Sequence, residues 1–178
     1  MAPSLVIHDR PLAYIERLTA RAPDAVDLVV VHCTELPDLA TAREYGERIV
    51  HPSGAGNSGH YYIDRDGSVF RYAPDARIAY HTRGYNERSI GVELVNIGRW
   101  PDWFDSRKQA MAEPYPDAQI EALLALLAHL RTALPHLTRI AGHEDLDTTR
   151  VVASDDATRE VRRKLDPGPM FPWPRVLS

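Results

Sequence analysis

The stretch Asp27-Leu-Val-Val-Val-His-Cys33 decides the fold of this chain. Its run of apolar, mostly β-branched residues predicts a strand buried on both faces, which places it in the middle of a sheet. Because side chains alternate along a strand, His32 and Cys33 point to opposite faces and cannot easily serve one site together. Cys33 is the sole cysteine, so an intramolecular disulfide is impossible and we expect its thiol to pack in the core.

The segments that follow this strand predict short elements around a loop. A helix is expected over 40–50, followed by a polar, glycine-rich loop over 51–59 with a composition typical of active-site loops. The segments 60–63 and 68–72 flank the turn Asp64-Arg-Asp-Gly67 and predict a β-hairpin.

A further strand is predicted over Ser89-Ile-Gly-Val-Glu-Leu-Val95. Ile90, Val92 and Leu94 share one face, so Glu93 lies on the other. A glutamate in the middle of a strand needs an explanation. It is either a group that transfers protons in a cleft or a buried, ion-paired structural residue.

The most regular helical pattern runs from Pro116 to Leu134, with apolar residues at i, i+3, i+4 and i+7 spacing between two prolines. We expect a short strand over 138–143 that runs into a loop, and a helical turn over 157–164. Strands mixed with helices, including a hairpin, indicate an α/β fold with a mixed central β-sheet flanked by α-helices. With 178 residues and no linker, we expect a single domain over 1–178.

Composition excludes several classes of function. A formal net charge of −4 offers no general attraction for nucleic acid. No apolar run approaches the roughly 20 residues needed to span a membrane. The N-terminus lacks the pattern of a signal peptide, so we expect a cytoplasmic protein, or a periplasmic or secreted one if a signal peptide was removed. Oligomeric state is left open.

Two histidines stand where predicted strands end, His32 and His143, and each could project into a cleft at the sheet edge. Asp166 lies in Lys164-Leu-Asp-Pro-Gly-Pro169, a segment stiffened by two prolines. Two imidazoles and one carboxylate, with a fourth position left to water, form a catalytic zinc arrangement. One alternative is that these histidines are core residues. Another is that His51, His60 or His81 is a metal ligand instead. We expect the remaining three histidines, His8, His129 and His136, at the surface.

Five ordered motifs resemble the zinc N-acetylmuramoyl-L-alanine amidases, which include AmpD-type and phage lysozyme-like enzymes and share a fold with the peptidoglycan recognition proteins. The resemblance covers about residues 28–173. The motifs are Val-Val-His-Cys-Thr34, Ser-Gly-His-Tyr-Tyr-Ile-Asp-Arg-Asp-Gly67, Ala-Tyr-His-Thr-Arg-Gly-Tyr-Asn-Glu-Arg-Ser-Ile-Gly-Val-Glu-Leu-Val95, Gly-His-Glu-Asp145 and Lys-Leu-Asp-Pro-Gly-Pro169.

The resemblance implies an enzyme with one Zn²⁺ that hydrolyses the amide between the lactyl group of N-acetylmuramic acid and L-alanine, in peptidoglycan or muropeptides. It implies His32, His143 and Asp166 as zinc ligands, with Glu93 and Lys164 as catalytic residues. The chemistry agrees, because zinc generates a hydroxide, a carboxylate can move protons and an ammonium can stabilise an oxyanion.

Other residues of these motifs are candidates for substrate binding. His81 resembles a position that lines the substrate cleft, and we group it with three neighbours in the motifs, Arg83, Asn86 and His60. A solvated loop is the alternative. Tyr61 and Tyr62 are expected to be mainly structural.

Two segments depart from the family pattern. Residues 146–163 carry extra polar residues, and Arg99-Trp-Pro-Asp-Trp103 adds two tryptophans that either stack on sugar faces or pack in the protein. A non-catalytic peptidoglycan-binding module on the same fold is the rival interpretation, and a zinc peptidase acting on other amides is a third.

Overall fold

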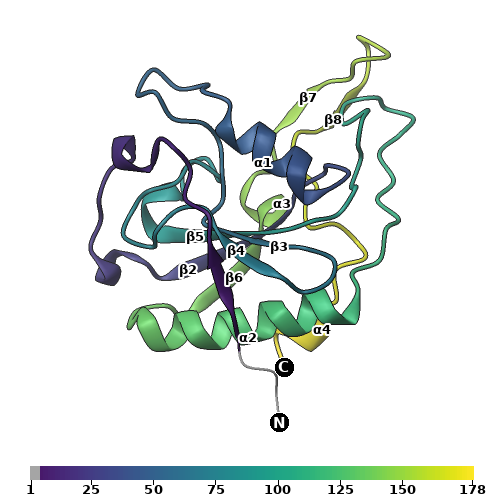
Figure 1. Ribbon diagram of the computed structural model, residues 1–178. Helices are drawn as coiled ribbons and strands as arrows, with labels where there is room; N and C mark the ends of the chain where they lie inside the picture. The colour runs from purple at the N-terminus through teal and green to yellow at the C-terminus, as the bar shows by residue number, and fades with distance from the viewer. Residues whose placement is uncertain (1–4) are drawn as a thin grey trace.

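The computed structural model describes residues 5–178, which contain a six-stranded mixed sheet (Figure 1). The strands follow the order β1-β4-β3-β5-β2-β6, and every neighbouring pair is parallel except the β3–β4 hairpin. The strands of this sheet are β1 (Ile7–Asp9), β2 (Leu28–Cys33), β3 (Tyr61–Ile63), β4 (Val69–Arg71), β5 (Ser89–Leu94) and β6 (Arg139–Gly142).

The prediction of a central strand at 27–33 is confirmed. All six residues of β2 are buried, and the strand lies between β5 and β6. The hairpin, the strand that carries Glu93 and the mixed α/β fold class are confirmed as well. The order of strands places the carboxyl ends of β2, β5 and β6 side by side, because all three run in the same direction.

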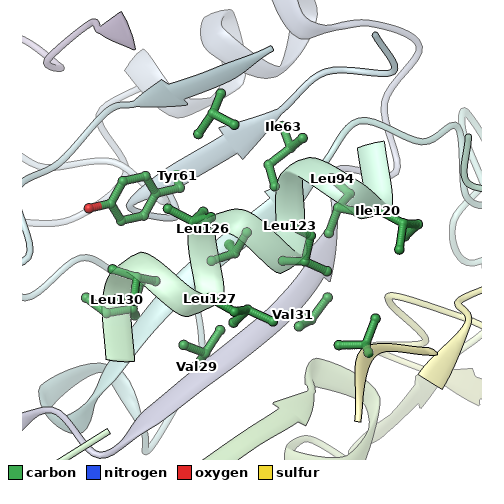
Figure 2. Close-up of a cluster of buried hydrophobic side chains, with 14 of the residues drawn as sticks. Val29, Val31, Tyr61, Ile63, Leu94, Ile120, Leu123, Leu126, Leu127 and Leu130 are labelled. Atoms are coloured by element: carbon green, nitrogen blue, oxygen red, sulfur yellow. The ribbon is translucent and has the colours of Figure 1, made fainter. Parts of the chain in front are cut away.

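The long helix α2 (Asp117–Ala133) covers one face of the sheet (Figures 1 and 2). Its apolar stripe packs on alternate residues of the strands, and Cys33 joins this core as expected. Figure 2 shows the contact between the leucines of the helix and the strand side chains. The buried residues labelled there are Val29, Val31, Tyr61, Ile63, Leu94, Ile120, Leu123, Leu126, Leu127 and Leu130.

The opposite face of the sheet is only partly covered, and the functional side chains gather there. Helix α1 (Leu39–Glu47) lies on this side (Figure 1). It begins where the side chain of Asp38 accepts a hydrogen bond from the Thr41 N–H at 2.7 Å. Because β2 alternates, Val29, Val31 and Cys33 face the α2 core while His32 faces the open side.

The helical turn predicted over 157–164 is wrong. Residues Glu160–Arg162 instead form strand β8, which pairs antiparallel with β7 (Arg150–Val152). Val161 is buried opposite Val151 while its charged neighbours point outward, so a period of two governs the segment.

The remaining elements are short. The loop expected after β6 begins with a helical turn, α3, and the chain ends near α4. No helix within residues 5–178 is long and apolar enough to cross a membrane. These elements are α3 (His143–Leu146), α4 (Trp173–Val176) and three 3₁₀ turns, Ile15–Arg17, Pro23–Ala25 and Asn86–Arg88.

Candidate metal centre and active site

Three side chains from distant parts of the sequence meet at the carboxyl ends of β2 and β6. His32 is near the end of β2, His143 directly follows β6, and Asp166 lies in the loop after β8. His32 Nδ1 and His143 Nδ1 lie 2.9 and 3.2 Å from Asp166 Oδ2. One ligand atom from each residue lies within 4.8 Å of the other two, and all three side chains are buried. The structure therefore brings the three predicted ligands together.

The arrangement of these three side chains is that of metal ligands rather than of a hydrogen-bonded cluster. Both imidazoles converge on Asp166 Oδ2, yet Asp166 Oδ1 and His143 Nε2 are buried without a hydrogen-bond partner. A buried carboxylate that served only to bind two histidines would normally use both of its oxygens. The donor set of two imidazoles and one carboxylate matches three-ligand zinc sites that leave one position open.

The protonation states also suit metal binding. Burial, together with the charge of His143, lowers the pKa of His32 to about 4. Burial opposes ionisation of Asp166, but His143 and His32 outweigh it and hold the pKa of the carboxyl well below its usual range. At neutral pH the site thus presents a neutral imidazole at His32 and a carboxylate at Asp166, the forms that coordinate metals.

The outer nitrogen of His32 is held by His81. His32 Nε2 lies 3.0 Å from His81 Nδ1, and His81 Nε2 lies 3.2 Å from Ser89 Oγ. Ser89 Oγ donates its own proton to the Tyr85 carbonyl, so it accepts from His81 Nε2. His81 Nδ1 is then an acceptor, and Thr82 Oγ1 also lies 2.9 Å from it and 3.2 Å from His32 Nε2. With its proton on Nε2, facing these two acceptors, His32 would have Nδ1 free to bind a metal.

Glu93 lies beside this centre because β5 pairs with β2 in a register that sets Glu93 opposite His32. Its Oε1 is 3.9 Å from His32 Nδ1, and its side chain is 15% exposed. Burial, and then the charge of Asp166, raises the pKa of Glu93 well above its usual value. No Lys or Arg lies within ion-pairing distance of Glu93 in residues 5–178, so the ion-paired structural alternative is not what the strand contains.

A cavity of about 490 Å³ opens over these side chains. Lys164, Arg83 and Asn86 line it, as do His81 and Glu93. Across the described chain, neither Lys164 nor Arg83 has a carboxylate within ion-pairing distance, so both ammonium and guanidinium groups are available to a ligand.

Asn86 and His60 have structural contacts that the sequence did not reveal. Asn86 Oδ1 accepts the backbone N–H groups of His81 and Thr82, at 3.0 and 2.7 Å, and so holds the loop that carries His81. His60 does not line the cavity and is fully buried. Its ring bonds to the Gly91 N–H and the Arg77 carbonyl, which places it in the interior rather than against a substrate.

The sequence reasoning did not single out the cavity residues Glu35 and Tyr80, and it named His51 only as a competing metal ligand. Glu35 lines the cavity with a left-handed backbone, φ 49°, for which the sequence gives no signal. His51 stacks on Tyr80 at the cavity wall, with ring centroids 4.2 Å apart. Trp100 and Trp103 do not line the cavity and pack edge to face on each other, which favours the packing interpretation for these two rings.

The chain is similar to curated amidases over much of its length. The AmpD 1,6-anhydro-N-acetylmuramyl-L-alanine amidase of Enterobacter cloacae is 31% identical over 64% of the chain and 51% of its own length. The AmpD enzyme of Haemophilus influenzae is 26% identical over 88% of the chain and 83% of its own length. The chain thus spans about half the length of the first of these relatives.

The fold has close counterparts among solved structures. One is the amidase AmiD from E. coli in complex with the substrate anhydro-N-acetylmuramic acid-L-Ala-D-gamma-Glu-L-Lys, with a TM-score of 0.65 and 23% identity over 89% of this chain and 59% of that one. Residues 22–169 match the family model described as N-acetylmuramoyl-L-alanine amidase. That match includes all three converging side chains and Glu93, and the chain belongs to the N-acetylmuramoyl-L-alanine amidase family.

Proposed function

We propose that the chain is a zinc-dependent amidase that cleaves the bond between the lactyl group of N-acetylmuramic acid and L-alanine. One observation carries the proposal: His32, His143 and Asp166 converge at the base of a cavity that Glu93 and Lys164 also line. The names of the relatives support this choice of substrate, since the AmpD enzymes are 1,6-anhydro-N-acetylmuramyl-L-alanine amidases.

His32, His143 and Asp166 would hold the ion. Zinc bound there would lower the pKa of its water to about 7 and so would supply a nucleophile at neutral pH. The orphaned Asp166 Oδ1 and the converging imidazoles support this assignment.

Glu93 is proposed as the group that moves protons. Its carboxylate lies beside His32, and no Lys or Arg of residues 5–178 lies within ion-pairing distance of it. It can therefore accept the proton of the attacking water and deliver it to the leaving amine of L-alanine. The cleaved amine needs that proton, because an amide anion is a poor leaving group.

Lys164 is proposed to stabilise the negative charge that develops on the substrate carbonyl oxygen. Its ammonium lines the cavity two residues before Asp166. A positive charge placed where an oxyanion forms binds the transition state more strongly than the ground state. Arg83 and the loop around His81 and Asn86 are proposed to contact polar groups of the muropeptide.

The test is product analysis by mass spectrometry, with soluble anhydro-muropeptide and intact sacculi as parallel substrates in H₂¹⁸O. We expect a released peptide with a free N-terminal L-alanine, and ¹⁸O in the lactyl carboxylate. The His32→Ala variant is the control and should give no product. Binding of muropeptide without cleavage by the zinc-loaded wild type would instead support the non-catalytic module, and cleavage at another amide would support the zinc peptidase.

A further inference from the structure

Arg99 is a buried cation that the proposed chemistry does not use. Its side chain is 1% exposed. Each of its five guanidinium N–H groups has an acceptor. Nε and Nη2 donate to the two carboxylate oxygens of Glu35 at 2.7 and 2.8 Å, and Nη1 donates to Gln109 Oε1 at 3.0 Å. The other two N–H groups reach the carbonyl oxygens of Arg162 and Arg163 at 2.9 and 3.3 Å.

These contacts join the two segments that bring the site together. Glu35 follows His32 by three residues and lies two residues after the end of β2. The carbonyls of Arg162 and Arg163 immediately precede Lys164, and Asp166 comes two residues later. Arg99 therefore ties the backbone that carries one candidate ligand to the backbone that carries another ligand and the candidate oxyanion group.

Neighbouring residues hold the Arg99–Glu35 ion pair in place. The left-handed backbone of Glu35 turns its carboxylate toward Arg99. Gly98 leaves space for this arrangement, because a Cβ there would lie 2.5 Å from Glu35 Cγ. Trp103 Nε1 donates to the Glu35 carbonyl at 2.9 Å. A buried ion pair is often no more stabilising than apolar residues of the same size, so stability alone is a weak reason for such an arrangement.

We propose that Arg99, held by Glu35, is a positioning residue for the Lys164–Asp166 segment. Lys164 makes no hydrogen bond or ion pair within residues 5–178, so its ammonium is placed by its backbone, whose two preceding carbonyls Arg99 binds. The same anchor sets Asp166 relative to His32. This inference rests on the proposed function and also joins the two segments that depart from the family pattern, 99–103 and 146–163.

The test measures zinc affinity on the full chain, independently of activity. Metal-free wild type, Arg99→Met, Arg99→Lys and the control Arg65→Met are titrated with zinc against a fluorescent chelator, after near-UV circular dichroism shows that each is folded. Arg65 is the matched control, because it makes similar contacts elsewhere. It donates to the two carboxylate oxygens of Glu113 at 2.6 and 3.2 Å and to the Pro37 carbonyl at 2.9 Å, but it does not contact residues 162–163.

We expect both Arg99 variants to bind zinc about 10- to 100-fold more weakly than wild type, the usual effect of removing a group that supports a ligand. Arg99→Lys keeps the charge, but one ammonium cannot bind two carboxylate oxygens and two carbonyls together. If Arg99→Met does not fold, the zinc affinity of Arg99→Lys tests the inference. Arg65→Met should bind within twofold of wild type. In the zinc-saturated Arg99 variants, kcat should fall while KM stays near the wild-type value.

Two results would overturn the inference and leave the proposed function standing: Arg99→Lys binding zinc within twofold of wild type, or Arg65→Met losing affinity equally. A wild type that binds no zinc would overturn both.

Discussion

At the residue scale, Glu93 separates proton transfer from metal binding. Its carboxylate is 3.9 Å from His32 Nδ1 and lies outside the group of three converging ligand atoms. Glu93→Gln keeps the shape of the side chain but removes its capacity to carry a proton. We expect the variant to bind one equivalent of zinc and to lose about 10²- to 10⁴-fold in kcat, the usual contribution of a general acid–base group.

Metal analysis and steady-state kinetics on the same preparation check this expectation. Loss of zinc from Glu93→Gln would make Glu93 a ligand, and unchanged turnover would move the proton-transfer role to another group. Thr41→Ala, at a half-buried position in the first turn of α1, is the control for purification and assay conditions.

Lys164 is the second residue whose role kinetics can isolate. Its ammonium gains strength of interaction as negative charge develops on the carbonyl oxygen, so removing it should weaken the transition state more than the bound substrate. We expect Lys164→Ala to keep its zinc and its unfolding midpoint, with kcat lower by roughly 10²–10³-fold. A raised KM at constant kcat would show that Lys164 binds substrate instead.

At the element scale, one face of strand β5 packs in the core and the other faces the candidate active site. Ile90, Val92 and Leu94 belong to the core under α2, while Gly91 and Glu93 face the histidines. The absence of a side chain at Gly91 makes room for His81, because a Cβ there would lie 2.6 Å from the ring carbon Cγ of His81.

Gly91→Ala should therefore displace His81 and release the outer nitrogen of His32. We expect a loss of about 1–3 kcal/mol in the free energy of unfolding from overpacking, and zinc affinity about 10-fold weaker. Urea denaturation and zinc titration measure the two effects. Gly46→Ala in α1 is the control. Its Cβ would lie 3.8 Å from the Asn57 carbonyl oxygen and from Ser58 Oγ, an ordinary contact distance, so zinc affinity should be unchanged.

The elements that sequence predicted well are those whose pattern repeats over many residues. Strand β2 is an unbroken apolar run of six residues and helix α2 follows the helical period over seventeen, and the predicted bounds lie within one residue of the observed ones. The three-residue strands β1 and β8 are too short for a period to appear, and pairing with distant residues creates them. This is why 157–164 was predicted as a helical turn.

At the scale of the whole molecule, the site combines residues that the sequence separates widely. His32 and His143 could be predicted because each stands at the carboxyl end of a predicted strand, and parallel strands bring their carboxyl ends to one edge. The pairing of Arg99 with Glu35 could not, because it depends on how two loops pack against each other. His60 shares a motif with the site residues yet is fully buried, because the Gly91 N–H and the Arg77 carbonyl hold its ring in the interior.

The burial of His60 makes the free energy of unfolding of the whole chain depend on pH. Its Nδ1 accepts the Gly91 N–H, so the neutral ring carries its proton on Nε2, which bonds to the Arg77 carbonyl and also lies 3.1 Å from Arg21 Nη2. A second proton would have to displace the Gly91 N–H from Nδ1. Burial, with the nearby charge of Arg21, lowers the pKa of His60 to about 3. The unfolded chain binds a proton at this histidine below a pKa of about 6.5, whereas the folded chain does not until about pH 3.

Stability should therefore fall as pH drops from about 6.5 toward 3, and His60 should account for one proton of that dependence. His60→Gln offers the same acceptor and donor without titrating. Between pH 7 and pH 5, metal-free wild type should lose about 2 kcal/mol more free energy of unfolding than His60→Gln, from one pKa difference of that size. Urea denaturation at both pH values measures this difference, in which the other buried histidines, present in both proteins, cancel. Parallel pH dependences would mean that His60 is protonated in the fold, and would contradict the hydrogen bonds assigned to its ring.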